Sequence, residues 1–395
     1  MEDRFAPLRI ECAPLNDYGS LESMIRGIRN ARPLDLSAER WQRVHPDVDF
    51  AQWQQQARGC VLEGLHYDPG SPDLRAEVLG REERAELIVE RVAFDTAPWI
   101  RVNGFFLLPK GAAYPVPGLV VFHAWGGPML FGKERIVDTG RDHPVLAEHR
   151  QTLYDGRFLV EEFARQGYAV IVIDAHHFGE RAPRGLNGIP SRYDPFSLSI
   201  SEYVALDNRV REQLYLGVRE LNWAGATWMG VNYWDDSRCI DYLRSRPEVD
   251  PERLGCTGLS GGGWRTNFLA ALDPRVRAAV SVGWMSIGDY QQLYNVAGAI
   301  GTFCLLPGVW DRLDVPDLSI MAAPCASMVV SASQDDLFPP EAQQEAARQI
   351  RAGYAWAGCP ERFCPFHPPK PHCYDQEIQQ AAIAWFDRHL KGQRR

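Results

Sequence analysis

The chain has 395 residues, of which 45% are hydrophobic and 24% charged, and its formal net charge is −9 at pH 7. This is the composition of a globular protein, and the length allows one large domain with an appendage or two domains. Acids and bases are interspersed, which argues against a nucleic-acid partner, because such a partner needs a basic face.

The first ten residues, MEDRFAPLRI, contain two acids and no apolar run, so we expect no signal peptide. No stretch approaches the roughly 18 uninterrupted apolar residues of a membrane span. The nine cysteines are too few and too scattered for a disulfide scaffold. We therefore expect a soluble, cytoplasmic protein with reduced thiols and no membrane partner. The sequence does not indicate an oligomeric state.

Residues 1–85 are predicted to form a polar N-terminal extension rather than an independent domain. Helical patterns cover residues 37–47 and 49–65. Trp41, Trp53 and Leu62 are expected on apolar helix faces that pack onto a larger domain, which comprises residues 86–395.

The pattern changes at residue 86. Residues 86–94 alternate as a strand, and residues 100–111 are a suitable antiparallel partner. Apolar runs then alternate with amphipathic segments, which predicts a doubly wound, mostly parallel α/β sheet. The predicted strands are 118–127, 169–180, 253–258, 277–284 and 325–333, and the predicted helices are 156–167, 235–247, 264–272, 340–353 and 375–390. Ligands bind at the carboxyl ends of such strands, so residues that follow the strands are the candidates for a site.

A long irregular insertion is predicted at residues 182–234, between a strand end and the next helix. Its position suggests part of a lid or a pocket wall at the rim of the site. About half of its aromatic side chains are expected to form its own small core. These aromatic residues are Tyr193, Phe196, Tyr203, Tyr215, Trp223, Trp228, Tyr233 and Trp234.

The strongest chemical signal is the G-x-S-x-G motif Gly258-Leu259-Ser260-Gly261-Gly262. A predicted strand ends at Gly258 and a helix begins at about Gly263, so Ser260 is expected on a tight strand-to-helix turn. A serine on such a turn acts as a nucleophile when a base and an oxyanion hole assist it. The alternatives are a glycine-rich structural turn and a phosphate loop, but no lysine follows as in a Walker loop.

The motif and its surroundings resemble the α/β-hydrolase superfamily, and within it the acetyl xylan esterase and dienelactone-hydrolase-like branch. The resemblance covers about residues 85–395. It is carried by residues 104–111 (GFFLLPKG), 121–128 (VFHAWGGP), 173–181 (IDAHHFGER) and 235–263, which end in the serine motif. It implies an α/β-hydrolase fold and a catalytic triad in the order Ser, Asp, His.

The resemblance implies which residues complete the triad. Family members place the acid in a D-x-x-x-P pattern after a late strand, which Asp335 fits, while the adjacent Asp336 stays an alternative. The base is expected just before the last helix, where His372 lies. His367 is a local rival, and His389 is expected on the surface or at the helix end.

The resemblance also assigns an oxyanion hole to the backbone amides of Gly261 and Trp125. His123 is read as a structural residue of the loop that carries Trp125. Trp264 and Trp284 follow strand ends and are candidates to line the substrate pocket.

Two further candidates for substrate contact are Trp228 in the insertion and His176 at a strand end. For His176 and its neighbour His177, a structural role in the core or a loop is the preferred alternative. Glu180 and Arg181 are expected to form a local ion pair.

A zinc site is a weak alternative for the residues near the C-terminus. The spacing C-x4-C-x2-H-x4-H matches no common structural zinc site, and five prolines stiffen the segment. We expect a proline-rich strand and loop instead, with no metal and no organic cofactor. The potential ligands are Cys359, Cys364, His367, His372 and Cys373.

Taken together, the sequence predicts a serine carboxylesterase acting on a small acetyl or short-chain ester, with carbohydrate esters as one substrate class. A carbon–carbon bond hydrolase and a serine peptidase use the same triad and stay as alternatives. A peptidase of the prolyl-oligopeptidase type needs a large propeller, which about 85 residues cannot build. A non-enzymatic binding protein on the same fold is a third alternative.

Overall fold

The computed structural model describes residues 34–288 and 304–392, and the single positions 24, 25, 27, 28, 31, 290 and 301. Their core is a nine-stranded sheet in the order β1-β2-β3-β5-β4-β6-β7-β8-β9. The strands are β1 Glu77–Glu83, β2 Leu87–Ala97, β3 Ile100–Pro109, β4 Val116–Phe122, β5 Ala169–Ile173, β6 Val249–Leu259, β7 Val276–Val282, β8 Ala326–Val330 and β9 Phe363–Phe366.

The pairs β1–β2, β2–β3 and β3–β5 are antiparallel, and the pairs β5–β4, β4–β6, β6–β7, β7–β8 and β8–β9 are parallel. The antiparallel start and the parallel remainder confirm the predicted fold class. Every residue of β4, β5 and β8 is buried, as expected for parallel strands covered on both faces. All seven residues of the edge strand β1 are exposed.

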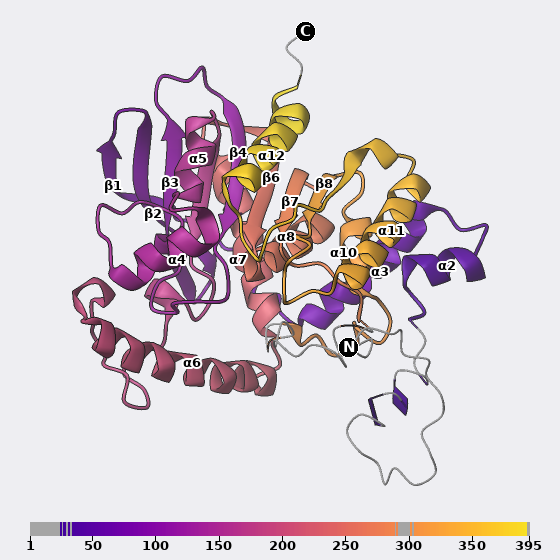
Figure 1. Cartoon of the computed structure of the whole chain (residues 1–395), viewed down its shortest axis with the longest axis horizontal. Coiled ribbons are helices and arrows are strands. Elements are labelled where there is room, and N and C mark those ends of the chain that lie inside the picture. The colour runs from indigo at the N-terminus through magenta and orange to yellow at the C-terminus, as the bar shows by residue number, and fades with distance from the viewer. Residues whose placement is uncertain are drawn as a thin grey trace.

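Helices cover both faces of the sheet (Figure 1). Residues of α5 and α12 share one buried cluster with the strands, whereas residues of α7 and α8 share another on the opposite face. The helices are α2 Ala38–Val44, α3 Phe50–Leu65, α4 Pro144–Tyr154, α5 Leu159–Arg165, α6 Ile200–Trp223, α7 Trp228–Ser245, α8 Gly261–Leu272, α10 Val315–Met321, α11 Pro340–Trp356 and α12 Gln376–Phe386. Of the described helices, none is long and apolar enough to cross a membrane.

Helices α2 and α3 lie where the sequence predicted them and are joined to the rest of the protein. Trp53 of α3 is fully buried, and its ring centroid lies 5.5 Å from that of Trp356 in α11. Leu62 of the same helix is 48% exposed, so the prediction that it packs onto the larger domain is wrong. Arg58 Nε donates to the carbonyl of Ala271 in α8 at 2.7 Å. Its Nη2 donates to the carbonyl of Met321 in α10 at 3.0 Å. Residues 50–65 therefore share one core with the main domain.

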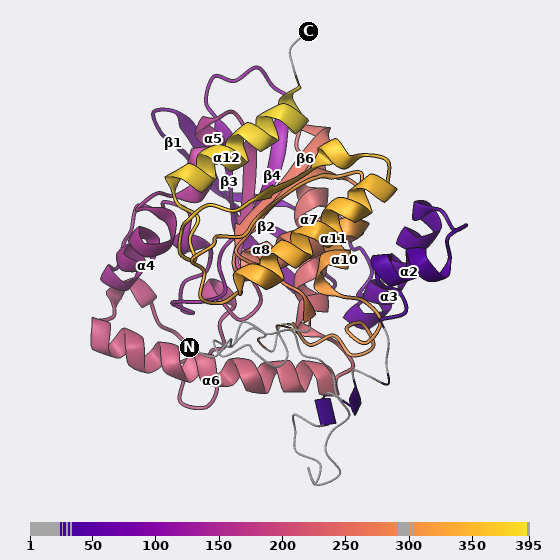
Figure 2. The same ribbon diagram turned by 45° about the vertical axis from the view of Figure 1, so that its right-hand side comes forward.

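The prediction that the insertion at residues 182–234 is irregular is wrong. The insertion contains α6, a helix of 24 residues, and its last residues form the first turns of α7. A capping box of Ser199 and Glu202 starts α6. Its buried side chains recur every three or four residues, which makes one face of a helix. They are Tyr203, Leu206, Asp207, Val210, Leu214 and Val218. Helix α6 lies along one end of the molecule, beside α4 (Figures 1 and 2).

Candidate active site

Ser260 occupies a sharp turn between β6, which ends at Leu259, and α8, which begins at Gly261. Its backbone has φ +59° and ψ −121°, a conformation that costs a non-glycine residue on the order of 1–3 kcal/mol. The Ser260 amide donates to the carbonyl of Val282 in β7 at 2.8 Å. The surrounding sheet therefore holds the turn in a strained form, with Ser260 only partly buried.

Close packing explains the glycines around Ser260. A Cβ atom at Gly258 or Gly262 would lie 2.7 or 2.6 Å from the carbonyl oxygen of Phe122 in β4. At Gly263 it would lie 2.6 Å from the carbonyl oxygen of Val282. Because backbone atoms cannot give way as side chains do, only glycine lets the turn pack between β4 and β7.

Asp335 and His372 are hydrogen bonded, with 2.6 Å between Asp335 Oδ2 and His372 Nδ1. Only 1% of the Asp335 side chain is exposed, against 20% for His372. The Leu337 amide donates to the other carboxylate oxygen of Asp335 at 3.0 Å. Asp336, the alternative acid, is exposed.

Backbone hydrogen bonds tie the loop that carries Asp335 to the one that carries His372. The amide of Ser333 donates to the carbonyl of Pro368 at 3.0 Å, and that of Gln334 to the carbonyl of Lys370 at 3.1 Å. Asp335 and His372 are 37 residues apart in sequence. Two backbone hydrogen bonds between their loops, together with their own hydrogen bond, therefore fix their relative position.

The two rival histidines lie elsewhere. His367 Nδ1 lies 3.2 Å from the carbonyl oxygen of Ser331. The ring of His389 packs 4.2 Å from that of Trp385, and burial lowers the pKa of His389 to about 4.

The imidazole of His372 lies at the carboxyl ends of β6 and β7. A Cβ atom at Gly283, just after β7, would lie 2.9 Å from His372 Cε1 and 3.3 Å from a methyl group of Leu259. His372 is therefore close to the turn that carries Ser260. Among the described residues no hydrogen bond joins His372 to the Ser260 hydroxyl. Catalytic hydrogen bonds often tighten only when a substrate binds.

The residues predicted for the oxyanion hole are in contact. A Cβ atom at Gly261 would overlap the Cβ of Trp125 and lie 3.1 Å from the Trp125 backbone nitrogen. Gly261 is the first residue of α8, and the first amides of a helix have no partner within the helix. The two backbone segments thus approach each other beside Ser260, where a substrate carbonyl would have to bind.

His123 is a structural residue, as expected. Its Nε2 accepts from the amide of Ala175 at 3.0 Å, so the proton is on Nδ1, which lies 2.8 Å from the carbonyl oxygen of Ala124. Burial lowers the pKa of His123 well below its usual value. Both ring nitrogens are engaged, and the ring stays neutral.

The four residues predicted to contact the substrate, Trp264, Trp284, Trp228 and His176, are largely buried. Trp264 and Trp284 are 1% and 3% exposed, and their ring centroids are 4.0 Å apart. Trp228, 3% exposed, packs edge to face on Trp125 at 4.6 Å. The amide of His176 donates to Asn232 Oδ1 at 2.9 Å, and burial lowers the pKa of the His176 ring well below its usual value. A role for these four residues in substrate contact stays a prediction.

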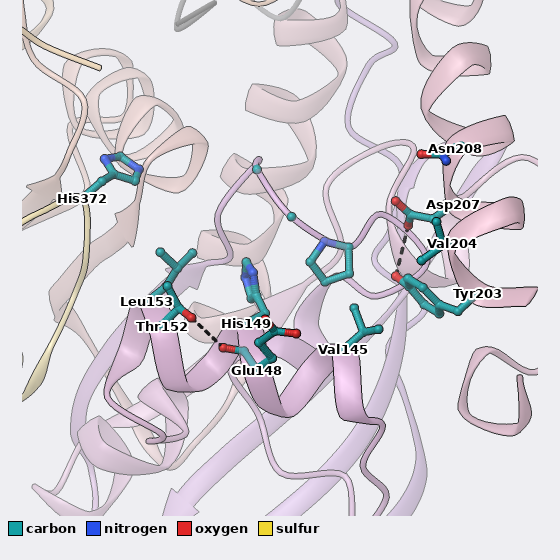
Figure 3. Close-up of a pocket in the computed structure, with 13 residues that line it drawn as sticks. Val145, Glu148, His149, Thr152, Leu153, Tyr203, Val204, Asp207, Asn208 and His372 are labelled. Carbon is teal, nitrogen blue, oxygen red and sulfur yellow. Dashed lines mark hydrogen bonds between the residues drawn. The ribbon is translucent and has the colours of Figure 1, made fainter. Parts of the chain in front are cut away.

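A cavity of about 560 Å³ opens beside His372, between α4 and α6 (Figure 3). The sequence did not predict that residues of α4 would line a cavity beside His372. In Figure 3 the labelled side chains of α4 run below the cavity, with Val145 at the end near Tyr203 and Val204 of α6 and Leu153 at the end near His372. The lining residues are Gly126, Gly127, Pro128, Val145, Glu148, His149, Thr152, Leu153, Tyr203, Val204, Asp207, Asn208 and His372.

The lining of this cavity is weakly acidic. Asp207 binds the amides of Met129 and Leu130 at 2.6 and 3.0 Å and pairs with Arg211 at 3.0 Å. Burial lowers the pKa of His149 to about 3, so its ring is neutral at pH 7. Glu148 is exposed, and the lining contains no lysine or arginine.

The predicted ion pair between Glu180 and Arg181 is wrong. Glu180 binds Lys133 at 3.1 Å, and Lys133 also binds the buried Asp174 at 2.7 Å. Arg181 instead pairs with Asp235 at 2.6 Å. The two neighbours extend in different directions because each finds a buried partner of opposite charge.

Residues 363–366 form strand β9, in agreement with the strand and loop expected for this proline-rich segment. Within the described part of the chain, no group of three or more His, Cys, Asp or Glu side chains is placed to hold a metal ion.

Comparisons with known proteins place the chain among hydrolases. A model of the Abhydrolase family matches residues 13–383. The Bacillus subtilis hydrolase YtaP is 24% identical over 324 residues, which are 82% of this chain and 95% of YtaP.

Solved structures of other proteins share the fold. An acetyl xylan esterase structure from Bacteroides fragilis has a TM-score of 0.64 and 17% identity, with 91% of this chain and 86% of that chain covered. A glucuronoyl esterase from Teredinibacter turnerae has a TM-score of 0.60 and 18% identity, with 90% and 88% covered.

Proposed function

Because the chain belongs to the Abhydrolase family, whose model matches residues 13–383, we propose that it is a serine hydrolase that cleaves small acetyl or short-chain carboxylic esters. Ser260 is the nucleophile, His372 the base and Asp335 the acid that orients the base. Carbohydrate esters are one substrate class in this proposal, since structures with this fold include an acetyl xylan esterase and a glucuronoyl esterase.

The observation that carries the proposal is the 2.6 Å hydrogen bond between Asp335 and His372 beside the strained turn of Ser260. A buried carboxylate bound to Nδ1 keeps the proton on that nitrogen and leaves Nε2 as the proton acceptor. It also stabilises the imidazolium that forms when Ser260 loses its proton.

In the proposed mechanism, His372 Nε2 takes the hydroxyl proton of Ser260 as Oγ attacks the ester carbonyl carbon. The carbonyl oxygen becomes negative and is held by the amides of Gly261 and Trp125. The intermediate then collapses, and His372 gives its proton to the leaving alcohol. Water, deprotonated by His372, attacks the acyl-enzyme and releases the acid and the free Ser260 hydroxyl.

The cavity between α4 and α6 is assigned to the leaving alcohol. The leaving oxygen must lie near His372, which protonates it, and His372 lines this cavity. A volume of about 560 Å³ is in the usual range for small-molecule sites. Near Gly261, the packed indoles of Trp125 and Trp228 fill space, which favours a short acyl group.

The experiment compares wild type and Ser260→Ala on p-nitrophenyl esters from acetate to decanoate. We expect activity that is highest with acetate or butyrate and falls by about a thousandfold or more in the variant. Labelling of Ser260 by a fluorophosphonate, located by peptide mass, checks the nucleophile independently. Thermal unfolding of both proteins controls for the fold.

Equal activity of wild type and Ser260→Ala would remove Ser260 as the nucleophile. Labelling of Ser260 without ester hydrolysis would instead favour an amide or a carbon–carbon bond as the substrate. Absence of both would favour a binding protein.

A further inference from the structure

Arg135 is a fully buried arginine whose guanidinium binds only backbone carbonyls. Its Nε donates to Phe131 at 2.8 Å, and its Nη1 donates to Ala124 at 2.7 Å and to Gly126 at 2.8 Å. Its Nη2 donates to the carbonyl of Pro128. None of the ion pairs found in the described residues includes Arg135. A buried charge with no carboxylate partner is costly, so this cation is retained at a price in stability.

All four carbonyls belong to one segment, residues 124–131, and that segment carries Trp125. The Ala124 carbonyl also accepts from His123 Nδ1 at 2.8 Å, so two donors fix its direction. His123 is itself fixed, because its Nε2 accepts from the amide of Ala175.

The direction of the Ala124 carbonyl determines that of the next amide. A peptide unit is planar, and in a trans peptide the C=O and the following N–H point in opposite directions. The bond between Ala124 and Trp125 is not among the cis peptides of the described residues. The Trp125 N–H therefore points away from Arg135. The Trp125 backbone nitrogen also lies close to Gly261, because a Cβ atom added to Gly261 would be 3.1 Å from it.

Aromatic contacts also link Arg135 to Trp125, through the ring of Phe178. The Arg135 guanidinium lies 5.2 Å from the ring centroid of Phe178, and the Phe178 ring packs edge to face on Trp125 at 5.1 Å. Both the backbone and the side chain of Trp125 thus depend on groups that contact Arg135.

We propose that Arg135 is a positioning residue for catalysis: it holds the segment 124–131 so that the Trp125 amide is directed at the oxyanion. The proposal rests on the function proposed above, and it adds a residue that acts through the backbone without touching the substrate. Its cation, placed on the carbonyl side of the peptide that links Ala124 and Trp125, also favours the negative charge that develops on the carbonyl oxygen.

The test uses Arg135→Lys, which keeps the charge but not the four-carbonyl geometry, and Arg135→Gln, which keeps two N–H donors without the charge. Arg246→Lys is the matched control. Arg246 is a largely buried arginine that binds Glu90 and Glu248, just before the start of β6 and hence at the opposite end of the strands. The readouts are kcat and KM with p-nitrophenyl butyrate, the thermal unfolding midpoint, and inhibition by butylboronic acid and by butyrate.

Butylboronic acid forms a tetrahedral adduct with an active serine and needs the oxyanion hole, whereas butyrate resembles a planar product. We expect Arg135→Lys and Arg135→Gln to lower kcat by about ten- to a thousandfold with little change in KM. Boronate affinity should fall in parallel and butyrate affinity should hold. Arg246→Lys should lose stability without either kinetic change.

The proposal is overturned if the Arg135 variants fold and keep the kcat and the boronate affinity of wild type, or if only KM rises. If neither variant folds, His123→Gln tests the same Ala124 carbonyl through its second donor. A fall in kcat and in boronate affinity would then support the proposal, and wild-type values would refute it. A wild-type protein that neither hydrolyses esters nor binds the boronate would contradict the proposed function itself.

Discussion

Two adjacent aspartates after β8 lie in different environments. Asp335 is buried and binds His372 at 2.6 Å, whereas Asp336 is exposed. We predict that Asp335→Asn lowers kcat with p-nitrophenyl acetate by about ten-thousandfold, because an amide cannot stabilise the imidazolium and favours the wrong tautomer. Asp336→Asn, of the same chemistry one residue away, should stay within about twofold of wild type. The reverse ranking of the two variants would assign the acid to Asp336.

Gly261 is required by a contact that only a glycine allows. A methyl group there would overlap Trp125, so Gly261→Ala is expected to push apart the two backbones of the oxyanion hole. A displacement of this size should lower kcat by about a hundredfold with little effect on KM. Steady-state kinetics with p-nitrophenyl butyrate measure both.

Gly59→Ala is the control for Gly261→Ala. Gly59 lies inside α3, and a Cβ atom there meets nothing within 4 Å. This substitution should leave kcat unchanged and stabilise the protein by about 0.5–1 kcal/mol. Equal kcat for the two variants would show that the contact with Trp125 is not needed.

At the scale of residues, the sequence best predicts features whose residues are contiguous in the chain. The turn around Ser260 is recognisable because its glycines, the strand and the helix are contiguous. The contact of Asp335 with His372 spans 37 residues and was inferred from the resemblance, since no spacing rule brings two distant loops together. The role of Arg135 was not predicted, because its partners are carbonyls and leave no mark on the sequence.

At the scale of elements, α6 is the main departure from the sequence reading. The position of segment 182–234 between a strand end and the next helix suggested an irregular lid, but buried positions at 203, 206, 210, 214 and 218 have a helical period. Only Tyr203 and Trp228 of its aromatic residues are fully buried, and Trp223 is 94% exposed. Helix α6 contributes one wall of the cavity beside His372, which depends on how it packs near α4.

This wall allows a test of leaving-group size. Val204 of α6 lines the cavity, and Val204→Trp should fill part of it. We expect KM to rise about tenfold or more for acetates of bulky alcohols, including acetylated xylosides, and to stay unchanged for ethyl acetate. Ile200→Trp places the same side chain one turn away, at a position that is 56% exposed and outside the cavity lining. If Val204→Trp and Ile200→Trp have the same KM for the bulky acetates and the same KM for ethyl acetate, the cavity does not hold the alcohol.

At the scale of the whole molecule, buried titratable groups set the dependence of stability on pH. Burial lowers the pKa of His149 to about 3, that of His177 and His389 to about 4, and that of His123 and His176 well below its usual value. In the unfolded chain these histidines have a pKa of about 6.5. They therefore bind protons on unfolding, and stability falls as the pH drops below about 6.5.

Four carboxyl groups act in the opposite sense. Burial raises the pKa of Glu161 and Asp317 to about 7 and that of Asp174 to about 6, and it also raises the pKa of Asp236. The folded state therefore keeps protons that the unfolded chain releases above about pH 4.5. Five histidines outweigh four carboxyl groups, which leaves a net uptake of about one proton on unfolding near pH 5.5. We predict that the free energy of unfolding by urea rises slightly from about pH 5 to about pH 6.5 and declines as Glu161 and Asp317 ionise near pH 7.

Variants with one histidine fewer measure this slope. His389→Gln should reduce it by about one proton, whereas His45→Gln, at an exposed position, should leave it unchanged. A stability that is constant or falls between about pH 5 and pH 6.5 would contradict the assignment of these histidines as neutral.

The class of the fold was predictable from the alternation of apolar runs and helical patterns, but the strand order was not. The position of β5 between β3 and β4 depends on crossovers that leave no trace in the residues of the strands. Strand β1 was missed because all seven of its residues are exposed, so it has no apolar alternation and forms only by pairing with β2.

The two ends of the sheet have a consequence for the protein at high concentration. An open edge strand offers unpaired amides and carbonyls to another chain and is a route to aggregation. Here β1 has charged side chains, among them Arg81, Glu82 and Glu83, and its pairing register shifts between Val78 and Gly80. At the other edge β9 has only four residues, and Pro365 removes one donor. Both edges are therefore poor templates for a tenth strand, and the sheet resists growing into fibrils from either side.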